Sequence, residues 1–281
     1  MVIGEALQKA TGRLSESGST SARLDAEVLL SHLLGQDRVY LVLHKNDPLS
    51  HEIEAAFEAL LCRRIKGEPI AYLTGSREFM SLTFSVSPGV LIPRPDTETL
   101  AEWAISTCRP IQNPRILDIC TGSGALAISL AHYLPQADVT ACDISPHCLQ
   151  TAQENAEKNG VSYRVRLQAW DVFASCPLRE RYHCIVSNPP YIPSDVVPTL
   201  ERDVRDFEPA LALDGGEDGL QFYRRIISLA PSLLQKDGYL AFEVGYDQAD
   251  SVAHQMKESG FSEIKKIPDL SGIFRVVCGQ M

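Results

Sequence analysis

The sequence is short of positive charge and has no long apolar run. It contains 26 Lys and Arg against 36 Asp and Glu among 281 residues, which gives a net charge of −10. An acidic surface repels phosphate, so direct binding of nucleic acid is not expected. No apolar run reaches the length of about 18 residues that a membrane-spanning helix needs. Residues 1–14 also lack the basic-then-apolar order of a signal peptide. We therefore expect a cytoplasmic protein that does not bind membranes.

The eight cysteines form no CxxC pair and have no histidine cluster beside them. Closely paired cysteines are the usual sequence mark of structural zinc, so no metal site is predicted. Several of the cysteines lie in apolar, strand-like segments, as buried free thiols do. This usage indicates a reducing compartment. The cysteines are Cys62, Cys108, Cys120, Cys142, Cys148, Cys176, Cys184 and Cys278.

Residues 1–75 have the pattern of a small helical bundle without a catalytic motif. A first helix is predicted between Ser21, its expected N-cap, and Gly35, which is expected to end it. Its apolar residues share one face of a helix: Leu24, Val28, Leu29, Leu33 and Leu34. A second helix is predicted over residues 50–66 and is ended by Gly67. Its buried side carries Ile53, Phe57, Leu60 and Leu61.

Residues 76–92 change to a period of two, which predicts a hairpin linker. From residue 93 to 281, strand-like and helix-like segments alternate. The composition, with 44% apolar and 22% charged residues, is that of a globular protein. Alternating β and α segments predict an α/β fold with a mostly parallel, Rossmann-like sheet covered on both faces. The strands are expected at 115–119, 138–143, 164–170, 183–188 and 238–245, and the helices around 123–134, 146–159 and 217–234.

The first of these strands leads into a glycine-containing loop. Gly122 and Gly124 allow a tight turn and a close approach of the backbone to a ligand. The N-terminus of the following helix favours a negative group. The loop is not a phosphate-binding P-loop, because no Gly-Lys-Ser/Thr follows. It is not G-x-G-x-x-G either, since position 127 is Ala, and a plain strand-to-helix turn remains the alternative. The candidate cofactor-binding residues are Cys120, Thr121, Gly122, Ser123 and Gly124.

Acidic residues end the next two predicted strands. Asp143 can accept hydrogen bonds from two ribose hydroxyls, or it can belong to the N-terminal cap of the next helix. Trp170 can cover an adenine face while Asp171 receives the exocyclic amine. The alternative is that Trp170 only fills the core. The glycine loop and these acids, in this order, resemble the class I S-adenosylmethionine-dependent methyltransferases. Cys120 replaces the glycine that is often found at that position.

The fourth strand runs into Asn188-Pro189-Pro190-Tyr191. This motif resembles that of methyltransferases that alkylate a planar nitrogen, either an amide or an exocyclic base amine. An sp² NH₂ group is a poor nucleophile with two donors. The Asn188 side-chain carbonyl and the Pro189 backbone carbonyl can accept both of them. The prolines add no competing N–H. We expect Asn188, Pro189 and Tyr191 to act in catalysis and all four residues to contact the substrate, with Asn188 also touching the cofactor.

Four further segments narrow the class. They are residues 24–27 and 67–72 in the helical part, and 91–98 and 208–220 around the motif. Together with Asn188–Tyr191 they resemble the release factor glutamine N5-methyltransferases, the PrmC/HemK family. The resemblance covers about residues 20 to 279. It implies S-adenosyl-L-methionine as cofactor, S-adenosyl-L-homocysteine as product, and the glutamine of the Gly-Gly-Gln motif in class 1 peptide chain release factors as substrate.

A glutamine of a protein must reach the methyl group in a pocket, so residues 1–75 are expected to recognise the substrate. The methyltransferase domain is expected over 93–281, and the protein is expected to be a monomer. A stability cap is the alternative for the helical part. Arg94 and Glu98 are expected to support the site or form its lid. Other candidates remain: a ribosomal protein glutamine methyltransferase, a DNA or RNA base-amine methyltransferase, and an inactive scaffold. A base-modifying enzyme would need a basic face, and a scaffold would tolerate loss of the motifs.

Overall fold

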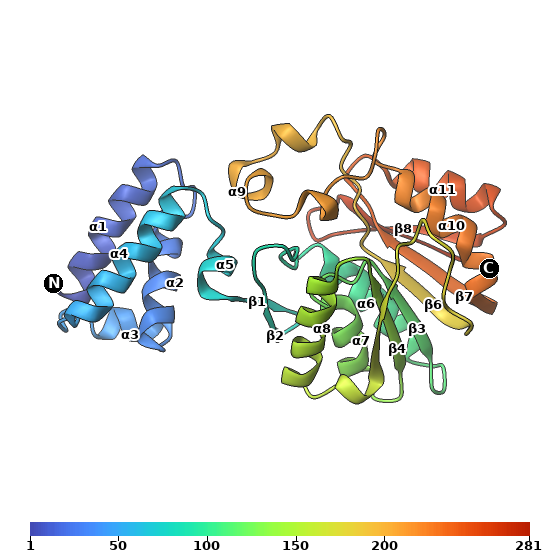
Figure 1. Cartoon of the computed structure of the whole chain (residues 1–281), viewed down its shortest axis with the longest axis horizontal. Coiled ribbons are helices and arrows are strands. Elements are labelled where there is room, and N and C mark those ends of the chain that lie inside the picture. Colours follow the sequence, from blue (N-terminus) through green and yellow to red (C-terminus); the bar gives the residue numbers. More distant parts are fainter. The chain divides into compact units, whose positions relative to one another are not determined.

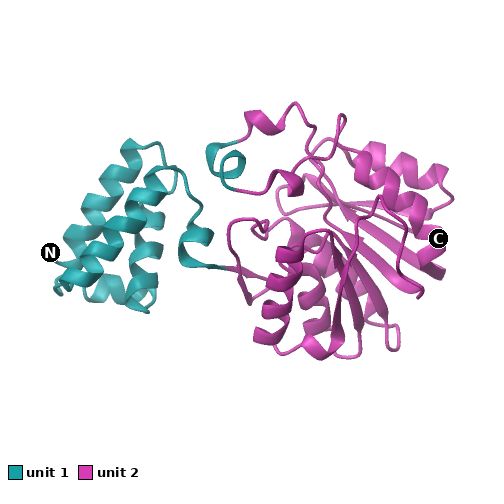
Figure 2. Cartoon of the chain, in the orientation of Figure 1, with its two compact units in different colours: residues 1–76, 201–207 teal, residues 77–200, 208–281 magenta.

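The computed structural model describes all 281 residues and divides into two compact units (Figure 2). Unit 1 comprises Met1–Ser76 and Glu201–Phe207, and unit 2 comprises Arg77–Leu200 and Glu208–Met281. The excursion at residues 201–207 interrupts the second unit, and no sequence pattern indicated it. None of the helices combines the length and apolar character needed to span a bilayer.

Unit 1 is helical, as predicted. Its helices are α1 (Ile3–Glu16), α2 (Ala22–Leu34), α3 (Arg38–Leu43), α4 (His51–Ile65), α5 (Ile70–Thr74) and the short α9 (Arg202–Arg205). Ser50 caps α4, since its side chain accepts from the backbone N–H of Ile53, and Gly35 ends α2 in the left-handed conformation at φ +62°. The two helices predicted from the apolar spacing are therefore confirmed.

The buried face of α2 differs from the predicted one. Leu24 is 44% exposed, whereas Leu29 and Leu30 are fully buried in the core of unit 1. The cause is a buried ion pair: Asp25 turns inward and accepts from Arg64 of α4 at 2.8 Å. Leu24, its immediate neighbour, then faces outward. The Ser21 hydroxyl donates to the same carboxylate instead of capping the helix.

Unit 2 is built on a seven-stranded sheet in the order β5-β4-β3-β6-β7-β9-β8. Figure 1 labels five of these strands, β3, β4, β6, β7 and β8. The five strands from β5 to β7 are parallel, and β9 runs antiparallel to both neighbours. The order confirms the predicted α/β fold. The strands are β3 (Arg115–Ile119), β4 (Asp138–Asp143), β5 (Val165–Ala169), β6 (Tyr182–Ser187), β7 (Leu234–Glu243), β8 (Ser262–Pro268) and β9 (Phe274–Gln280).

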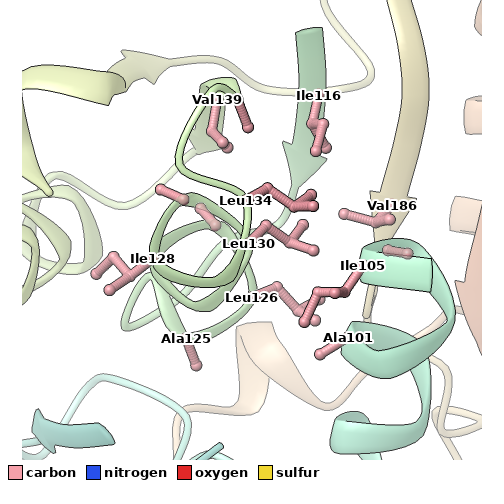
Figure 3. Packing of buried hydrophobic residues seen from close by; sticks show 14 of the residues in the cluster. Ala101, Ile105, Ile116, Ala125, Leu126, Ile128, Leu130, Leu134, Val139 and Val186 are labelled. Carbon is pink, nitrogen blue, oxygen red and sulfur yellow. The ribbon is translucent and has the colours of Figure 1, made fainter. Parts of the chain in front are cut away.

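Helices cover both faces of this sheet. One face carries α6 (Thr97–Cys108), α7 (Ala125–Tyr133) and α8 (Pro146–Lys158), and the other carries α10 (Gln221–Leu233) and α11 (Ala249–Glu258). Figure 3 shows Leu126 and Leu130 of α7 pointing toward Ile105 of α6 and Val186 of β6. Each such side chain contributes roughly 1.5–3 kcal/mol by leaving water. Three-residue 3₁₀ turns complete the chain at Ser162–Arg164, Val197–Thr199 and Ala210–Ala212.

The hairpin before this sheet consists of β1 (Ser76–Phe79) and β2 (Leu82–Ser85). Phe79 and Phe84 are fully buried and belong to the core of unit 2, where their rings meet edge to face. Residues 86–96 then run as a loop to α6. The sequence patterns did not predict α6, α11, β8 or β9.

Candidate active site

The pocket lies where the strand order reverses. From β3 the chain continues outward to β4, while β6 lies on the other side of β3. In open α/β sheets a crevice forms at the carboxyl ends of the strands at such a point. A pocket of about 330 Å³ lies there, entirely within unit 2. Two segments, within residues 89–97 and 209–212, contribute to its lining from before and after the motif in sequence.

The glycine loop forms one wall of this pocket. Gly122 and Gly124 have φ +56° and +81°, and a Cβ at Gly124 would lie 2.8 Å from the Ile128 side chain. Cys120 also has a positive φ, +64°, which explains why glycine is common at this position. The loop is anchored by Asn155 of α8, whose side-chain amide donates to the carbonyl of Ser123 at 2.9 Å.

The buried carboxyl group of Asp118 supports the glycine loop from β3. Asp118 on β3 is fully buried and accepts from the Thr121 hydroxyl at 2.6 Å. Burial raises the pKa of Asp118 to about 7, because the charged form loses its hydration. The second carboxyl oxygen, Oδ1, has no well-aligned donor, and hydrogen bonding from the backbone of Ala127 together with Thr121 opposes the increase in pKa. This carboxyl therefore holds Thr121 in place, and its pKa lies near neutral pH.

Asp143 stands at the end of β4 and faces the pocket. Its carboxylate accepts from the backbone N–H of Gly122 and of Ser145, both at 2.9 Å. Burial raises the pKa of Asp143, and these two donors oppose the increase. The N-cap of α8 is Ser145, which accepts from the backbone N–H of Cys148. Ser145, and not Asp143, therefore caps α8.

Aromatic residues form a second wall. Trp170 is 6% exposed and belongs to the core beneath the pocket as well as lining it. Its indole nitrogen is buried without a partner. Phe173 and Phe222 meet edge to face with ring centroids 5.0 Å apart and also line the pocket. Asp171 accepts from the backbone N–H of Phe173 at 2.9 Å.

The Asn188–Tyr191 motif follows β6 directly. The Ser187 hydroxyl donates to the carbonyl of Ile119 at 2.6 Å, which ties together the ends of β6 and β3. Asn188 is half-buried, and its side-chain amide nitrogen donates to the Thr97 hydroxyl at 3.1 Å. Thr97 is the first residue of α6 and is itself buried. This contact leaves the carbonyl oxygen of the Asn188 side chain available to the pocket.

Close backbone packing holds the motif from behind. A Cβ at Gly215 would lie 2.7 Å from the Cα of Tyr191 and 2.9 Å from the carbonyl oxygen of Pro190. The Gln248 side chain donates to the carbonyl of Tyr191 at 2.8 Å. Gly215 has no side chain, and this is what permits the motif backbone to pass so close to it.

Arg94 lies in the pocket lining, whereas Glu98 contacts the hairpin. Arg94 lines the pocket and forms an ion pair with the buried carboxylate of Glu208. Glu98 instead accepts from the backbone N–H of Met80 at 2.7 Å, at the turn of the hairpin. Met80 has φ +49°, so this contact holds a strained turn. Glu98 does not line the pocket.

Most of the predicted site residues meet in this one pocket. Those that line it are Cys120, Thr121, Gly122, Ser123, Asp143, Trp170, Asp171, Asn188 and Pro190. Gly124, Pro189 and Tyr191 do not line it, and Tyr191 packs against the core and donates weakly, at 3.4 Å, to Glu243. The pocket is also lined by Thr97, Phe173, Leu211 and Phe222, which no motif had marked as site residues. Thr97 and Leu211 lie in segments 91–98 and 208–220, which carry the family resemblance, whereas Phe173 and Phe222 lie outside them.

The strand order together with this pocket places the protein among the class I methyltransferases. A methyltransferase of known structure from Pyrococcus furiosus shares the fold, with a TM-score of 0.53 and 19% identity over 79% of this chain and 96% of that one. The family model "PrmC N-terminal domain" matches residues 5–75, and "Methyltransferase small domain" matches residues 97–200.

Relatives that match over nearly the whole chain define the family more narrowly than the fold does. The release factor glutamine methyltransferase of Geobacter sulfurreducens is 44% identical over 280 residues, covering 99% of this chain and 96% of its own. That of Bordetella pertussis is 43% identical over 259 residues, covering 92% and 95%. The chain therefore belongs to the release factor glutamine methyltransferase family, as its motifs predicted.

Proposed function

We propose that this protein transfers a methyl group from S-adenosyl-L-methionine to the side-chain amide nitrogen, N5, of the Gly-Gly-Gln glutamine in class 1 peptide chain release factors. S-adenosyl-L-homocysteine is the second product. One observation carries the proposal: the oriented carboxamide of Asn188 shares a pocket with the glycine loop and Asp143. Release factors act in translation, so the reaction belongs in the cytoplasm.

The residues of the pocket fit the cofactor. A carboxylate has about four acceptor positions. Each oxygen of Asp143 accepts from one backbone donor, Gly122 or Ser145, and can still accept from a ribose hydroxyl. Space beside Gly122 is open, since a Cβ there would meet nothing within 4 Å. Trp170 and Phe173 offer apolar surface for a purine. The bound cofactor would supply a methyl group made electrophilic by a sulfonium.

The chain's own contribution is to hold and aim the glutamine amide. Asn188, which lines the pocket, offers Oδ1 as one acceptor for its N–H groups. The backbone carbonyl of Pro189 is the second acceptor that the motif predicts, although Pro189 does not line the pocket before substrate binds. Neither Pro189 nor Pro190 has an N–H, so no local donor competes with the amide. Two acceptors also increase electron density on a weak nucleophile. Alignment of this kind supplies roughly 7–11 kcal/mol at best.

The test uses purified full-length protein, methyl-labelled S-adenosylmethionine and two substrates. One is a class 1 release factor, and the other is the same factor with its Gly-Gly-Gln glutamine replaced by alanine. Label is expected on the first alone. Asn188→Ala should abolish transfer and leave cofactor affinity within a few-fold. Label on both factors, or on neither, contradicts the proposal.

The rival substrate is a glutamine of a ribosomal protein. The relatives at 44% and 43% identity carry the release factor name, which favours the release factor. The two are separated by offering both proteins to the enzyme in one reaction. Preferential labelling of the ribosomal protein would reassign the substrate without changing the chemistry. The intact motif and pocket argue against an inactive scaffold.

A further inference from the structure

Gln248 is a buried side chain whose amide joins three separate segments behind the catalytic motif. The residue is 7% exposed and lies directly before α11. Its Nε2 donates to the carbonyl of Tyr191 at 2.8 Å and to the carbonyl of Gly219 at 3.3 Å. Its Oε1 accepts from the backbone N–H of Gly245 at 3.0 Å. The three segments are the end of the motif, the loop before α10 and the turn after β7.

The orientation of the Gln248 amide follows from its partners. A backbone carbonyl can only accept a hydrogen bond, and a backbone N–H can only donate one. The Nε2 atom must therefore face Tyr191 and Gly219, and Oε1 must face Gly245. Flipping the amide would set its oxygen against two carbonyls and its NH₂ group against an N–H, so all three contacts would be lost. The amide is therefore held in one orientation.

Two glycines give this amide the room that it needs. A Cβ at Gly245 would lie 2.9 Å from Oε1 of Gln248, and a Cβ at Gly219 would lie 2.7 Å from its Nε2. Gly219 also has φ +70°, a conformation that other residues rarely adopt. A side chain at either position would push the amide away from the motif. The segments that Gln248 joins are therefore shaped around it.

The catalytic motif cannot be anchored through backbone donors of its prolines. Pro189 and Pro190 have no N–H, and their φ angles are fixed. Few backbone torsions remain free between Asn188 and the carbonyl of Tyr191, so ties at these two ends determine the path between them. The Asn188 side chain ties one end, since it donates to the first residue of α6 at 3.1 Å. Gln248 ties the other end.

We propose that Gln248 is a positioning residue of the methyl transfer, which fixes the Tyr191 end of the motif and thereby aims the Pro189 carbonyl at the glutamine amide. The inference rests on the proposed function and deepens it. Gln248 does not line the pocket, so it acts through the backbone of the motif. Its loss should therefore slow the transfer step and leave the binding of cofactor and release factor nearly unchanged.

The experiment compares Gln248→Met and Gln248→Glu with the wild-type full-length enzyme. The first change keeps the length of the side chain and removes its N–H groups. The second keeps the volume and an oxygen for the N–H of Gly245, but the new carboxyl donates to one carbonyl at most when protonated and to none when ionised. Transfer is measured on a release factor with Gly-Gly-Gln, and cofactor binding by calorimetric titration. Both variants should lower kcat at least tenfold, with the KM of the factor and the Kd of S-adenosylmethionine within threefold of wild type.

The matched control is Arg181→Met. Arg181 directly precedes β6 and also donates to two backbone carbonyls, those of Pro231 at 3.3 Å and Leu234 at 2.7 Å. These contacts lie at the amino end of the strand that carries the motif at its carboxyl end. The control should lose stability, as measured by urea denaturation, and keep kcat within about twofold of wild type.

A double variant, Gln248→Met with Gly215→Ala, separates positioning from a general loss of stability. Both changes act on the backbone of Tyr191, through a lost hydrogen bond in one case and a close Cβ in the other. The double variant should therefore lose little more kcat than the more affected single variant. Effects at independent sites would multiply instead.

If Gln248→Met does not fold, Gln248→Glu decides the question, since it preserves volume and the acceptor for Gly245. A wild-type enzyme that fails to label Gly-Gly-Gln overturns the proposed function. A wild-type enzyme that labels it, with kcat in the Gln248 variants within threefold of its own, overturns only the role assigned to Gln248. A kcat loss that Arg181→Met shares, or that multiplies with the loss in Gly215→Ala, also overturns that role.

Discussion

The guanidinium of Arg94 forms an ion pair with the carboxylate of Glu208, 114 positions later in the chain. The Glu208 side chain is 2% exposed and the Arg94 side chain 34%. The backbone N–H of Ile92 donates to the same carboxylate at 3.3 Å. Pro209 and Leu211, next to Glu208, line the pocket together with Arg94. The ion pair therefore links the two segments that line the pocket from before and after the catalytic motif.

Removing Arg94 should be costly, because a buried carboxylate loses the cation that faces it. We expect Arg94→Ala to lower the free energy of unfolding by about 2–4 kcal/mol, measured by urea denaturation. The matched control is Arg224→Ala. Its partner is Asp218, both side chains are 50% exposed, and the expected loss is about 1 kcal/mol or less. Equal losses in the two variants would show that Glu208 does not depend on Arg94.

The carboxylate of Asp143 should govern cofactor affinity. Asp143→Asn keeps the size of the side chain but replaces one acceptor oxygen with a donor, next to the N–H groups of Gly122 and Ser145. We expect S-adenosylmethionine to bind at least tenfold more weakly, as measured by calorimetric titration. Asp138→Asn, at the exposed start of the same strand, should leave the affinity unchanged. An unchanged affinity in Asp143→Asn would exclude a role for this carboxylate in binding.

Glu243 should stabilise the fold less as the pH rises. Burial raises the pKa of Glu243 from 4.5 to about 7, so the folded protein keeps this proton where the unfolded chain has lost it. Its contribution to stability is therefore complete below about pH 4.5 and is lost progressively up to about pH 7. Above pH 7, Glu243→Gln should be more stable than wild type by up to about 3 kcal/mol.

The measurement is urea denaturation of both proteins at pH 5 and pH 8. Asp118 has a pKa raised in the same direction, so the wild-type slope alone is not diagnostic. The difference between the two proteins isolates Glu243. A difference that does not grow between pH 5 and pH 8 would contradict the prediction. A more stable Glu243→Gln enzyme with lower turnover would show that the buried charge serves the site and not the fold.

Gly215→Ala should displace the catalytic motif. The added Cβ would lie 2.7 Å from the Cα of Tyr191, where only a backbone shift relieves the clash. We expect kcat to fall by about 10²-fold, since small misplacements of catalytic groups cost that much. Gly12→Ala is the control, because its Cβ would meet nothing within 4 Å inside α1. That variant should keep full activity and gain about 0.5–1 kcal/mol of stability.

Local patterns predicted the centre of the catalytic domain well. β3 and β4 occupy the predicted ranges, and α7, α8 and α10 lie within a few residues of theirs. Buried parallel strands are short apolar runs, and Ser145 and Pro146 mark the start of α8. The edge strand β8 and its neighbour β9 escaped prediction. β8 carries exposed Lys and Glu side chains and so lacks a clear apolar period.

The sequence by itself determined the chemistry of the site: the glycine loop, the acids at the strand ends, and an Asn-Pro-Pro-Tyr motif suited to a planar nitrogen. It did so because each motif is contiguous and its residue types limit what it can bind. Only the tertiary structure decided the partners of those motifs. Thr97 reaches Asn188 across 91 positions, and Glu243 and Gly215 reach Tyr191 from later elements. Such contacts depend on the order of strands in the sheet, which no local pattern records.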